Sequence, residues 1–428
     1  MKRLLVLTLL VTLLFGGGAV ASKVYAGGET EGSRPVDLGN GSGTWQAMDS
    51  NTEHTLYGVW GVSGSNVFAV GASSTILRYS GYLWSPHDTP GTTGDIEDVC
   101  GNSSVDVFAV QYDSSLWGSG ATLLKYITGS TWTQMTSFET DRALYGIWSS
   151  SSADIFVVGE KLTIYHYNSI TDTLTLMNGG EETDPDLTGV WGTSPNDVFA
   201  VGDEGAILYY NGNQWTFMYS GTKVLLEGIW GTSHNDVFAV GDEGTILHYN
   251  GSTWSQVNIG ESWLSGVWGS SSSDVFAVGQ WGTILHYNGS TWSSMTSGTT
   301  AWLWDVWGSS GQDVFAVGSP EWDGQQSTIL HYTYDPSTLY VSKYEGCGGN
   351  NPCYETIQDA IDAAAINAVI KIARGTYAGS MTLNKSLSLT LQGGWDTDFQ
   401  SPAGTTLLRQ APKAPKGSLT LQRLTIRP

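Results

Sequence analysis

A repeat of about 40 residues limits how this chain can fold more than any other feature. Aligning the sequence with itself gives seven copies, each marked by a motif like GVWG that ends at Gly61, Gly101, Ser149, Gly192, Gly231, Gly269 and Gly308. Such a period is typical of propellers and solenoids. Each copy contains four short β-like segments separated by turn residues, which predicts one four-stranded antiparallel blade. Helical solenoids need longer runs of 3.6-residue periodicity, so we expect an all-β chain.

The two ends of the repeat array complement each other. A lone fourth-strand segment, Gly43 to Met48, precedes the first copy, and the seventh copy stops after its third strand at Tyr332. If the N-terminal strand completes the last blade, the outer edge of that blade's third strand is no longer unpaired. The sequence therefore predicts a seven-bladed β-propeller over residues 43–336, closed by an N-terminal strand.

The N-terminus predicts export. Two basic residues precede an apolar run from Leu4 to Phe15, and Val24 and Ala26 suit a signal peptidase, so residues 1–26 are interpreted as a signal peptide and 27–42 as a linker. The apolar run is too short to span a bilayer, so no membrane insertion is expected after cleavage. We expect a secreted protein, extracellular or at the cell surface, with the periplasm as an alternative.

Charge argues against one class of partner. The 428 residues carry 40 acidic and 18 basic side chains, a formal charge of -22. This charge repels nucleic acid, so no nucleic-acid partner is expected.

Residues that recur in nearly every copy are interpreted as scaffold. Tryptophans recur at two positions, which predicts packing between blades. An aspartate opens the second strand of six copies, where it would fix the preceding turn through backbone N–H groups.

One third-strand position differs in residue type between copies. It holds His166, His248, His286 and His331 but also Arg78, Lys125 and Tyr209, which favours packing or local hydrogen bonds over a metal site. Cys100 replaces one of the tryptophans and is interpreted as a buried substitute.

The connection between the second and third strands varies from copy to copy, unlike the other turns. Loops on a rigid scaffold are where recognition diversifies, so the face that carries these loops is our binding hypothesis. The candidate ligand-binding residues are Tyr112, Asp113, Trp117, Trp281, Glu321, Trp322 and Asp323. Asp203, Glu204, Asp242 and Glu243 form two DEG turns that could hold calcium, although each loop supplies few ligands and no cofactor is assigned. Acidic residues near the pore, Glu97, Asp98, Glu227 and Asp305, are a further candidate mouth.

The repeats resemble bacterial extracellular propellers of the Asp-box type and of the photosystem II assembly-factor type over about two thirds of the chain. The segment YNGSTW is similar to an Asp-box turn, but Asn250 and Asn288 directly precede their glycines, which departs from that pattern. Sialidase-type propellers hold their substrate with three arginines, whereas only Arg78 and Arg142 lie in the predicted propeller. A pair of catalytic carboxylates of the glycosidase type is an alternative that the sequence leaves open. No nucleophile elbow, phosphate loop, HExxH or CxxC motif is present.

Residues 337–428 differ in composition from the repeats. An amphipathic helix is expected from Glu355 to Ala365, followed by short strands. The segment resembles the N-terminal cap and first coils of a right-handed parallel β-helix, as in pectate-lyase-like domains. It holds about three coils, which suggests either a truncated β-helix or a short module that docks on the propeller. Cys347 and Cys353 suit a small disulfide loop in an exported chain.

These observations lead to one expected function and two alternatives. We expect a secreted, non-enzymatic binding protein that holds a glycan or a protein on the variable loops. The alternatives are a polysaccharide-active enzyme of glycosidase or lyase type, and a purely structural surface protein. The sequence specifies neither the ligand nor the oligomeric state.

Overall fold

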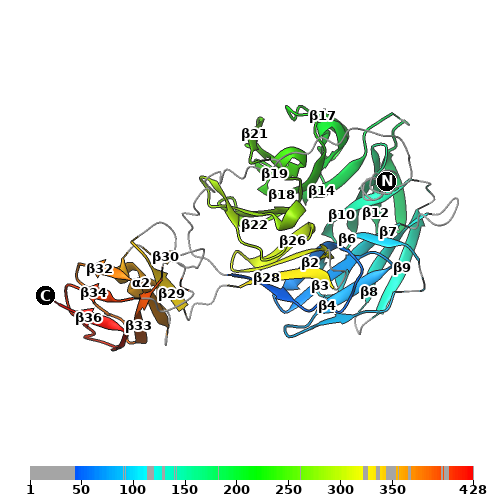
Figure 1. Ribbon diagram of the computed structural model, residues 1–428. Helices are drawn as coiled ribbons and strands as arrows, with labels where there is room; N and C mark the ends of the chain where they lie inside the picture. Colours follow the sequence, from blue (N-terminus) through cyan, green and yellow to red (C-terminus); the bar gives the residue numbers. More distant parts are fainter. Residues whose placement is uncertain are drawn as a thin grey trace, which may run out of the picture. The chain divides into compact units, whose positions relative to one another are not determined.

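The computed structural model describes residues 44–427, apart from residues 90, 92, 113–119, 128–130, 139, 141, 182, 261, 322–325, 334–337, 344–352, 355, 365–367, 397–398 and 400–403. Seven four-stranded antiparallel sheets occupy the described part of residues 44–333. They are the blades of a propeller, and Figure 1 shows their first strands around a common centre. The seven blades and the all-β class predicted from the repeat are confirmed.

The blades follow the chain in order. Blade 1 contains β2 (Leu56–Ser63), β3 (Asn66–Gly71), β4 (Thr75–Tyr79) and β5 (Trp84–Pro86). Blade 2 contains β6 (Asp95–Ser103), β7 (Asp106–Tyr112), β8 (Ala121–Ile127) and β9 (Thr131–Phe138). Blade 3 contains β10 (Leu144–Ser151), β11 (Asp154–Gly159), β12 (Thr163–Asn168) and β13 (Thr173–Asn178). Blade 4 contains β14 (Leu187–Ser194), β15 (Asp197–Gly202), β16 (Ile207–Tyr210) and β17 (Trp215–Met218).

The remaining blades repeat this pattern. Blade 5 contains β18 (Leu226–Ser233), β19 (Asp236–Gly241), β20 (Thr245–Tyr249) and β21 (Trp254–Asn258). Blade 6 contains β22 (Leu264–Ser271), β23 (Asp274–Gly279), β24 (Ile284–Tyr287) and β25 (Trp292–Met295). Blade 7 contains β26 (Leu303–Ser310), β27 (Asp313–Pro320) and β28 (Ser327–Thr333), and its fourth strand is β1 (Thr44–Met48) from the start of the described chain.

The blades form a continuous ring. Each first strand contacts the first strands of the blades on either side, and β26 of blade 7 contacts β2 of blade 1. The strand β1 runs antiparallel to β28, with Thr44 opposite Thr333 and Met48 opposite Ile329. The hydrogen-bond ladder of blade 7 is therefore composed of strands from the two ends of the propeller sequence.

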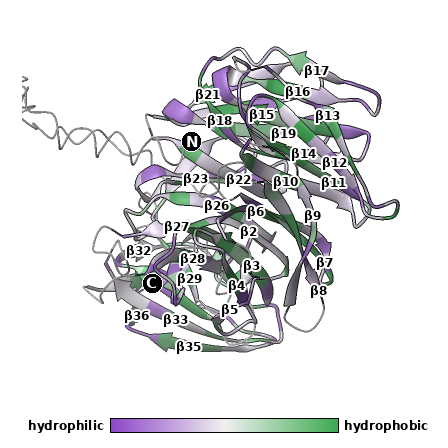
Figure 2. Ribbon diagram, turned by 90° about the vertical axis from the view of Figure 1, so that its right-hand side faces the viewer, coloured by the Kyte–Doolittle hydropathy of each residue, from purple (hydrophilic) through white to green (hydrophobic). Residues whose placement is uncertain are grey.

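The second strand of each blade is its most buried element. Its burial pattern is nearly uniform because other blades cover both faces of the sheet, so apolar residues do not alternate with polar ones. A phenylalanine from each of these strands is at most 2% exposed, at Phe68, Phe108, Phe156, Phe199, Phe238, Phe276 and Phe315. Figure 2 shows the hydrophobic residues concentrated along the strands. The core consequently lies between the sheets, not in the centre of the ring.

A tryptophan from one blade packs over a glycine of the next. A Cβ atom added to Gly101 would lie 2.6 Å from the ring of Trp60, and one added to Gly308 would lie 2.6 Å from the ring of Trp268. These positions must be glycine because the indole occupies the space of a side chain. The packing role predicted for the first-strand tryptophans is confirmed.

Three further predictions concern the repeated tryptophans, histidines and aspartates. Each outer-strand tryptophan contacts a phenylalanine of the preceding blade, as Trp84 does with Phe315 at 6.0 Å between ring centroids, which confirms packing between blades. The histidines make local hydrogen bonds as predicted, for example 2.7 Å from His286 Nε2 to Asp274 Oδ1. The backbone role predicted for the aspartates is replaced by a side-chain role, since the Ser270 hydroxyl donates to Asp274 in the preceding turn.

The C-terminal module consists of two small parallel sheets. One has the order β30 (Cys353–Tyr354), β29 (Thr338–Val341), β31 (Val369–Ala373), β33 (Ser388–Trp395) and β35 (Ser418–Gln422). The other has the order β32 (Gly375–Tyr377), β34 (Thr406–Leu408) and β36 (Leu424–Ile426). The predicted helix is present as α2 (Ile357–Ala363), which begins after Thr356, whose side chain accepts from the Asp359 N–H. From β31 onward, successive strands alternate between the two sheets.

Some predictions fall outside the described residues. The signal peptide and the linker precede residue 44, and Cys347 and the side chain of Cys353 are likewise outside. Within the described part of the chain, no helix has the length and apolar character needed to cross a membrane.

Candidate binding face

Two sets of connections meet on one face of the propeller. The connection after the second strand hydrogen-bonds to the residue just before the first strand of the same blade, as in Asp242 N to Leu225 O (3.0 Å) and Gln280 N to Trp263 O (2.9 Å). We call this surface the variable face, and it comprises the connections between second and third strands and between fourth and first strands. Because backbone bonds fix these loops, their side chains are presented on a rigid base.

A left-handed turn recurs in the connection between second and third strands of five blades, including Ser73 in blade 1 and Lys161 in blade 3, and in blades 4 to 6 it displays one acidic or aromatic side chain. The tip residues are Glu204 in blade 4, Glu243 in blade 5 and Trp281 in blade 6, with φ of 54°, 57° and 59°. A left-handed conformation is uncommon for residues other than glycine and is unfavourable for a bulky one. Trp281 is nevertheless 57% exposed, so burial of its indole does not explain the tryptophan. Because the turn recurs in other blades, the exposed indole and not the backbone conformation makes Trp281 a candidate contact residue.

Four partly exposed aromatic side chains form a row across three blades of the variable face. We call this set the aromatic row: Trp263, Trp302, Trp304 and Tyr57. The rings of Trp302 and Trp304 are stacked, with centroids 4.6 Å apart and planes 7° apart. Trp263 meets Trp302 at 5.5 Å and 67°, and Tyr57 meets Trp304 at 6.1 Å and 81°.

Hydrogen bonds hold the central pair of the row. The indole N–H of Trp302 donates to Ser265 Oγ, and that of Trp304 donates to Ser319 Oγ, both at 2.9 Å. The polar edges of these two indoles are therefore occupied within the protein. Their contribution to a ligand is aromatic contact, not hydrogen bonding.

Trp281 and Glu321, two of the predicted contact residues, converge on the loop that leads into the aromatic row. The N–H of Gly282, next to Trp281, donates to the carbonyl of Ala301 at 2.7 Å. From the other side, the Glu321 carboxylate accepts from the Thr300 N–H at 3.2 Å and from the Thr300 hydroxyl at 2.9 Å. Blades 6 and 7 thus fix the loop before Trp302 from both sides.

The Glu321 carboxylate stays ionised on this face. Its pKa is lowered, chiefly because the Thr299 hydroxyl donates to it, with further bonds from Thr300 that outweigh a smaller opposing effect of desolvation. The variable face therefore presents a fixed negative charge next to the loop that carries Trp302.

The other predicted contact residues have different outcomes. Tyr112 ends β7 in blade 2, partly buried against the core, and no contact joins it to Trp281 or Glu321 among the described residues. Asp113, Trp117, Trp322 and Asp323 lie outside the described residues.

The two DEG turns belong to different blades. Asp203 and Glu204 belong to blade 4, and Asp242 and Glu243 belong to blade 5. Over the described ranges, no group of three or more His, Cys, Asp or Glu side chains is arranged to hold a metal ion. The structure thus gives no support to the calcium hypothesis for these turns.

Two of the acidic residues near the pore serve the ring itself. Asp98 Oδ2 accepts from Ile147 N at 3.0 Å, and Asp305 Oδ2 accepts from Val59 N at 2.8 Å, so each carboxylate bridges to the next blade. Glu97 is only 8% exposed. These three do not form the open acidic mouth that the sequence suggested.

A partly buried tyrosine lies near carboxylates in blade 3. The pKa of Tyr145 is raised, mainly by burial and then by the nearby Glu160, Asp186 and Glu97 carboxylates. Its hydroxyl lies 3.4 Å from Glu160 Oε1, and Glu160 is 7% exposed. Because Glu160 is nearly inaccessible, its carboxylate offers little contact to a ligand.

Our sequence interpretation missed the aromatic row, although a signal was present. The residue before the buried leucine or isoleucine that begins the repeat motif is Thr55, Asp95, Ala143, Asp186 or Leu225 in five blades but tryptophan at positions 263 and 302. These two tryptophans depart from the repeat in the connection between the fourth and first strands, whereas the binding hypothesis covered only the connections between the second and third strands.

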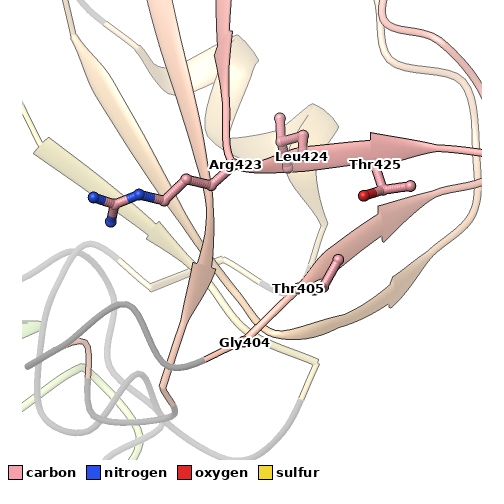
Figure 3. Close-up of a pocket in the computed structure, with 5 residues that line it drawn as sticks. All are labelled: Gly404, Thr405, Arg423, Leu424 and Thr425. Atoms are coloured by element: carbon pink, nitrogen blue, oxygen red, sulfur yellow. The ribbon is translucent and has the colours of Figure 1, made fainter.

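The C-terminal module has an open cavity of about 500 Å³ lined by Gly404, Thr405, Arg423, Leu424 and Thr425. Figure 3 shows the Arg423 side chain extending away from those of Leu424 and Thr425. The lining of this cavity combines one cation with two threonines, a leucine and a glycine, which defines no particular chemistry.

The chain is thus a seven-bladed β-propeller with an aromatic row on its variable face. It is similar to the solved structure of YCF48 bound to D1 peptide, with 15% identity, a TM-score of 0.56 and coverage of 71% of this chain and 98% of that one. It is also similar to YCF48 from Cyanidioschyzon merolae (14%, 0.54, 68% and 99%) and to the WD40 beta propeller domain of Doa1 (12%, 0.56, 68% and 96%). The sequence matches no protein-family model and no curated protein. At these identities the comparisons show the propeller fold alone.

Proposed function

We propose that this chain is a secreted, non-enzymatic binding protein whose propeller holds a glycan or a protein on the variable face. The observation that carries the proposal is the aromatic row beside Trp281. Aromatic side chains that are partly exposed and held by second partners are typical of binding surfaces, where they contribute large contact areas at small entropic cost.

The scaffold supports this role. The loops of the variable face are tied by backbone hydrogen bonds to a core whose second strands are almost fully buried. A rigid base means that little conformational entropy is lost when a ligand binds. One similar propeller, YCF48, was solved bound to D1 peptide, which shows that a propeller of this kind accommodates a peptide.

Three features of the chain belong to the same proposal. Residues 1–26 would direct export and be removed, because they have the charge and apolar pattern of a secretory signal. β1 would close the ring, since it supplies the fourth strand of blade 7. Residues 337–428 would form the first coils of a right-handed parallel β-helix, because successive strands alternate between two parallel sheets.

Arrays of glycans and peptides, probed with the chain from Gly27 onward, would test the binding role. We expect at least one class to be retained by the wild type and lost in Trp281→Ala. As a matched control, Tyr82→Ala changes an aromatic that is 92% exposed in a turn between third and fourth strands, on the opposite face. Two results would contradict the proposal: array binding that is lost equally in Trp281→Ala and Tyr82→Ala, or no binding of the wild type to any glycan or peptide.

A further inference from the structure

We propose that the variable face binds a lysine- or arginine-bearing peptide segment, with its cationic side chains between the aromatic row and the carboxylates of blades 4, 5 and 7. This inference rests on the binding role proposed above and adds the chemistry of the ligand.

The distribution of charge along the chain favours a cation. Residues 44–337 contain 31 acidic and 5 basic side chains, whereas residues 338–428 contain 6 acidic and 9 basic ones. The negative charge of the chain therefore belongs to the propeller. A surface of one sign attracts ligands of the other sign and raises their association rate.

Of the five cations in residues 44–337, Arg142, Lys161 and Lys223 lie in connections of the variable face, where acidic side chains outnumber them. Lys125 pairs with Asp106 at 3.1 Å, and Arg78 Nε donates to Asn66 Oδ1 at 2.8 Å. Both cations lie near the end of a third strand, away from the variable face at which that strand begins. Arg142 donates to the Gly180 carbonyl at 2.8 Å. Among the described residues, no lysine or arginine pairs with the tip carboxylates Glu204 and Glu243 or with Glu321.

The carboxylates and the aromatic side chains occupy one stretch of the variable face. Going round the ring, blades 4 and 5 present Glu204 and Glu243, blade 6 presents Trp281 and blade 7 presents Glu321. A cation over an aromatic face gains electrostatic energy from the ring, and a nearby carboxylate adds to it. A peptide that follows this stretch would place several cationic side chains within reach of both.

The geometry of the row favours a peptide over an extended neutral glycan. Successive planes in the row differ by 67°, 7° and 81°, and the central pair covers one face of each of its own rings. Such rings do not form the single flat surface on which consecutive sugar rings would stack. A neutral glycan would also gain nothing from the charge of the propeller.

Isothermal titration with an N-acetylated octalysine peptide, an octaglutamate peptide and neutral hexasaccharides of glucose, xylose and N-acetylglucosamine tests the inference on the chain from Gly27 onward. We expect octalysine alone to bind, with an affinity that falls as salt rises. Trp281→Ala should weaken binding roughly tenfold, and Glu204→Gln combined with Glu243→Gln should weaken it further. The matched controls are Tyr82→Ala and Asp172→Asn, both in turns of the opposite face, and they should bind like the wild type.

The outcomes separate the two proposals. Octalysine affinity that is unchanged in Trp281→Ala, or reduced equally in the controls, would mean diffuse charge attraction and would overturn the peptide site. Binding of a hexasaccharide that depends on Trp281 would overturn the cationic ligand and leave the binding face intact. If no probe binds in a way that depends on Trp281, the cationic-segment inference fails, and the arrays described above decide separately whether the face binds at all.

Discussion

The thiol of Cys100 in blade 2 lies 3.5 Å from the hydroxyl of Ser149 in blade 3. Corresponding positions elsewhere in the ring hold a tryptophan and a glycine, as in Trp191 and Gly231. Two departures from the repeat thus meet at one contact between blades. Cys100 is smaller than the usual tryptophan and leaves room for Ser149, which is larger than the usual glycine. Burial raises the pKa of the Cys100 thiol, which keeps it in the unreactive thiol form. The interpretation of Cys100 as a buried substitute is confirmed.

This pair should behave as a coupled unit. Cys100→Trp alone would force the indole against the Ser149 side chain and lower the free energy of unfolding by about 1–3 kcal/mol. Adding Ser149→Gly should restore most of that loss, because it recreates the tryptophan–glycine contact of the other blades. Urea unfolding of both single variants and the double variant measures the coupling. Strictly additive effects would show that the two residues do not share one space.

The strand β1 should stabilise the whole ring. Trp45 is 9% exposed and lies 5.2 Å from Tyr332 and 6.2 Å from Phe276 between ring centroids. Trp45→Ala should lower the free energy of unfolding by about 3–5 kcal/mol. The control is Gln46→Ala on the exposed side of the same strand, which should change it by less than about 0.5 kcal/mol. Equal melting temperatures for the two variants would argue against closure by β1.

Acid should weaken the propeller through its aspartate–histidine pairs. Burial raises the pKa of Asp274 and Asp313, but hydrogen bonds from His286 and Ser270, and from His331 and Ser309, outweigh it and lower both below 3.8. A carboxyl group with a lowered pKa in the folded state contributes stability above its unfolded pKa, and this stability is lost as pH falls through the folded value. Unfolding free energies should therefore decline below about pH 4, and less steeply in Asp313→Asn. A decline of the same steepness in that variant would exclude this cause.

Trp281 should be dispensable for stability. Its φ of 59° is unfavourable for any residue with a Cβ atom, so Trp281→Gly relieves strain that offsets the greater chain entropy of glycine. We expect the free energy of unfolding to stay within about 1 kcal/mol of the wild type, while ligand binding is lost. Thermal unfolding and titration of the same preparation separate the two effects. A large loss of stability would assign Trp281 a structural role.

The repeat made the architecture predictable because every blade buries the same residues in the same places. The tryptophan–glycine contacts and the phenylalanine of each second strand follow from that repetition. The aromatic row was not predicted, because Trp263 and Trp302 lie 39 residues apart in sequence and become neighbours only when adjacent blades pack. Glu321 was predicted as a contact residue, but its bonds to Thr299 and Thr300 were not, because these partners lie more than 20 residues away in the loop before the first strand of the same blade.

Hydrogen–deuterium exchange with a bound ligand tests the central claim most directly. The account predicts that ligand slows exchange in segments 280–282 and 299–304 of the variable face, and leaves the turns at 250–254 and 288–292 on the opposite face unchanged. Slowed exchange confined to those opposite turns, with segments 280–282 and 299–304 unaffected, would contradict it.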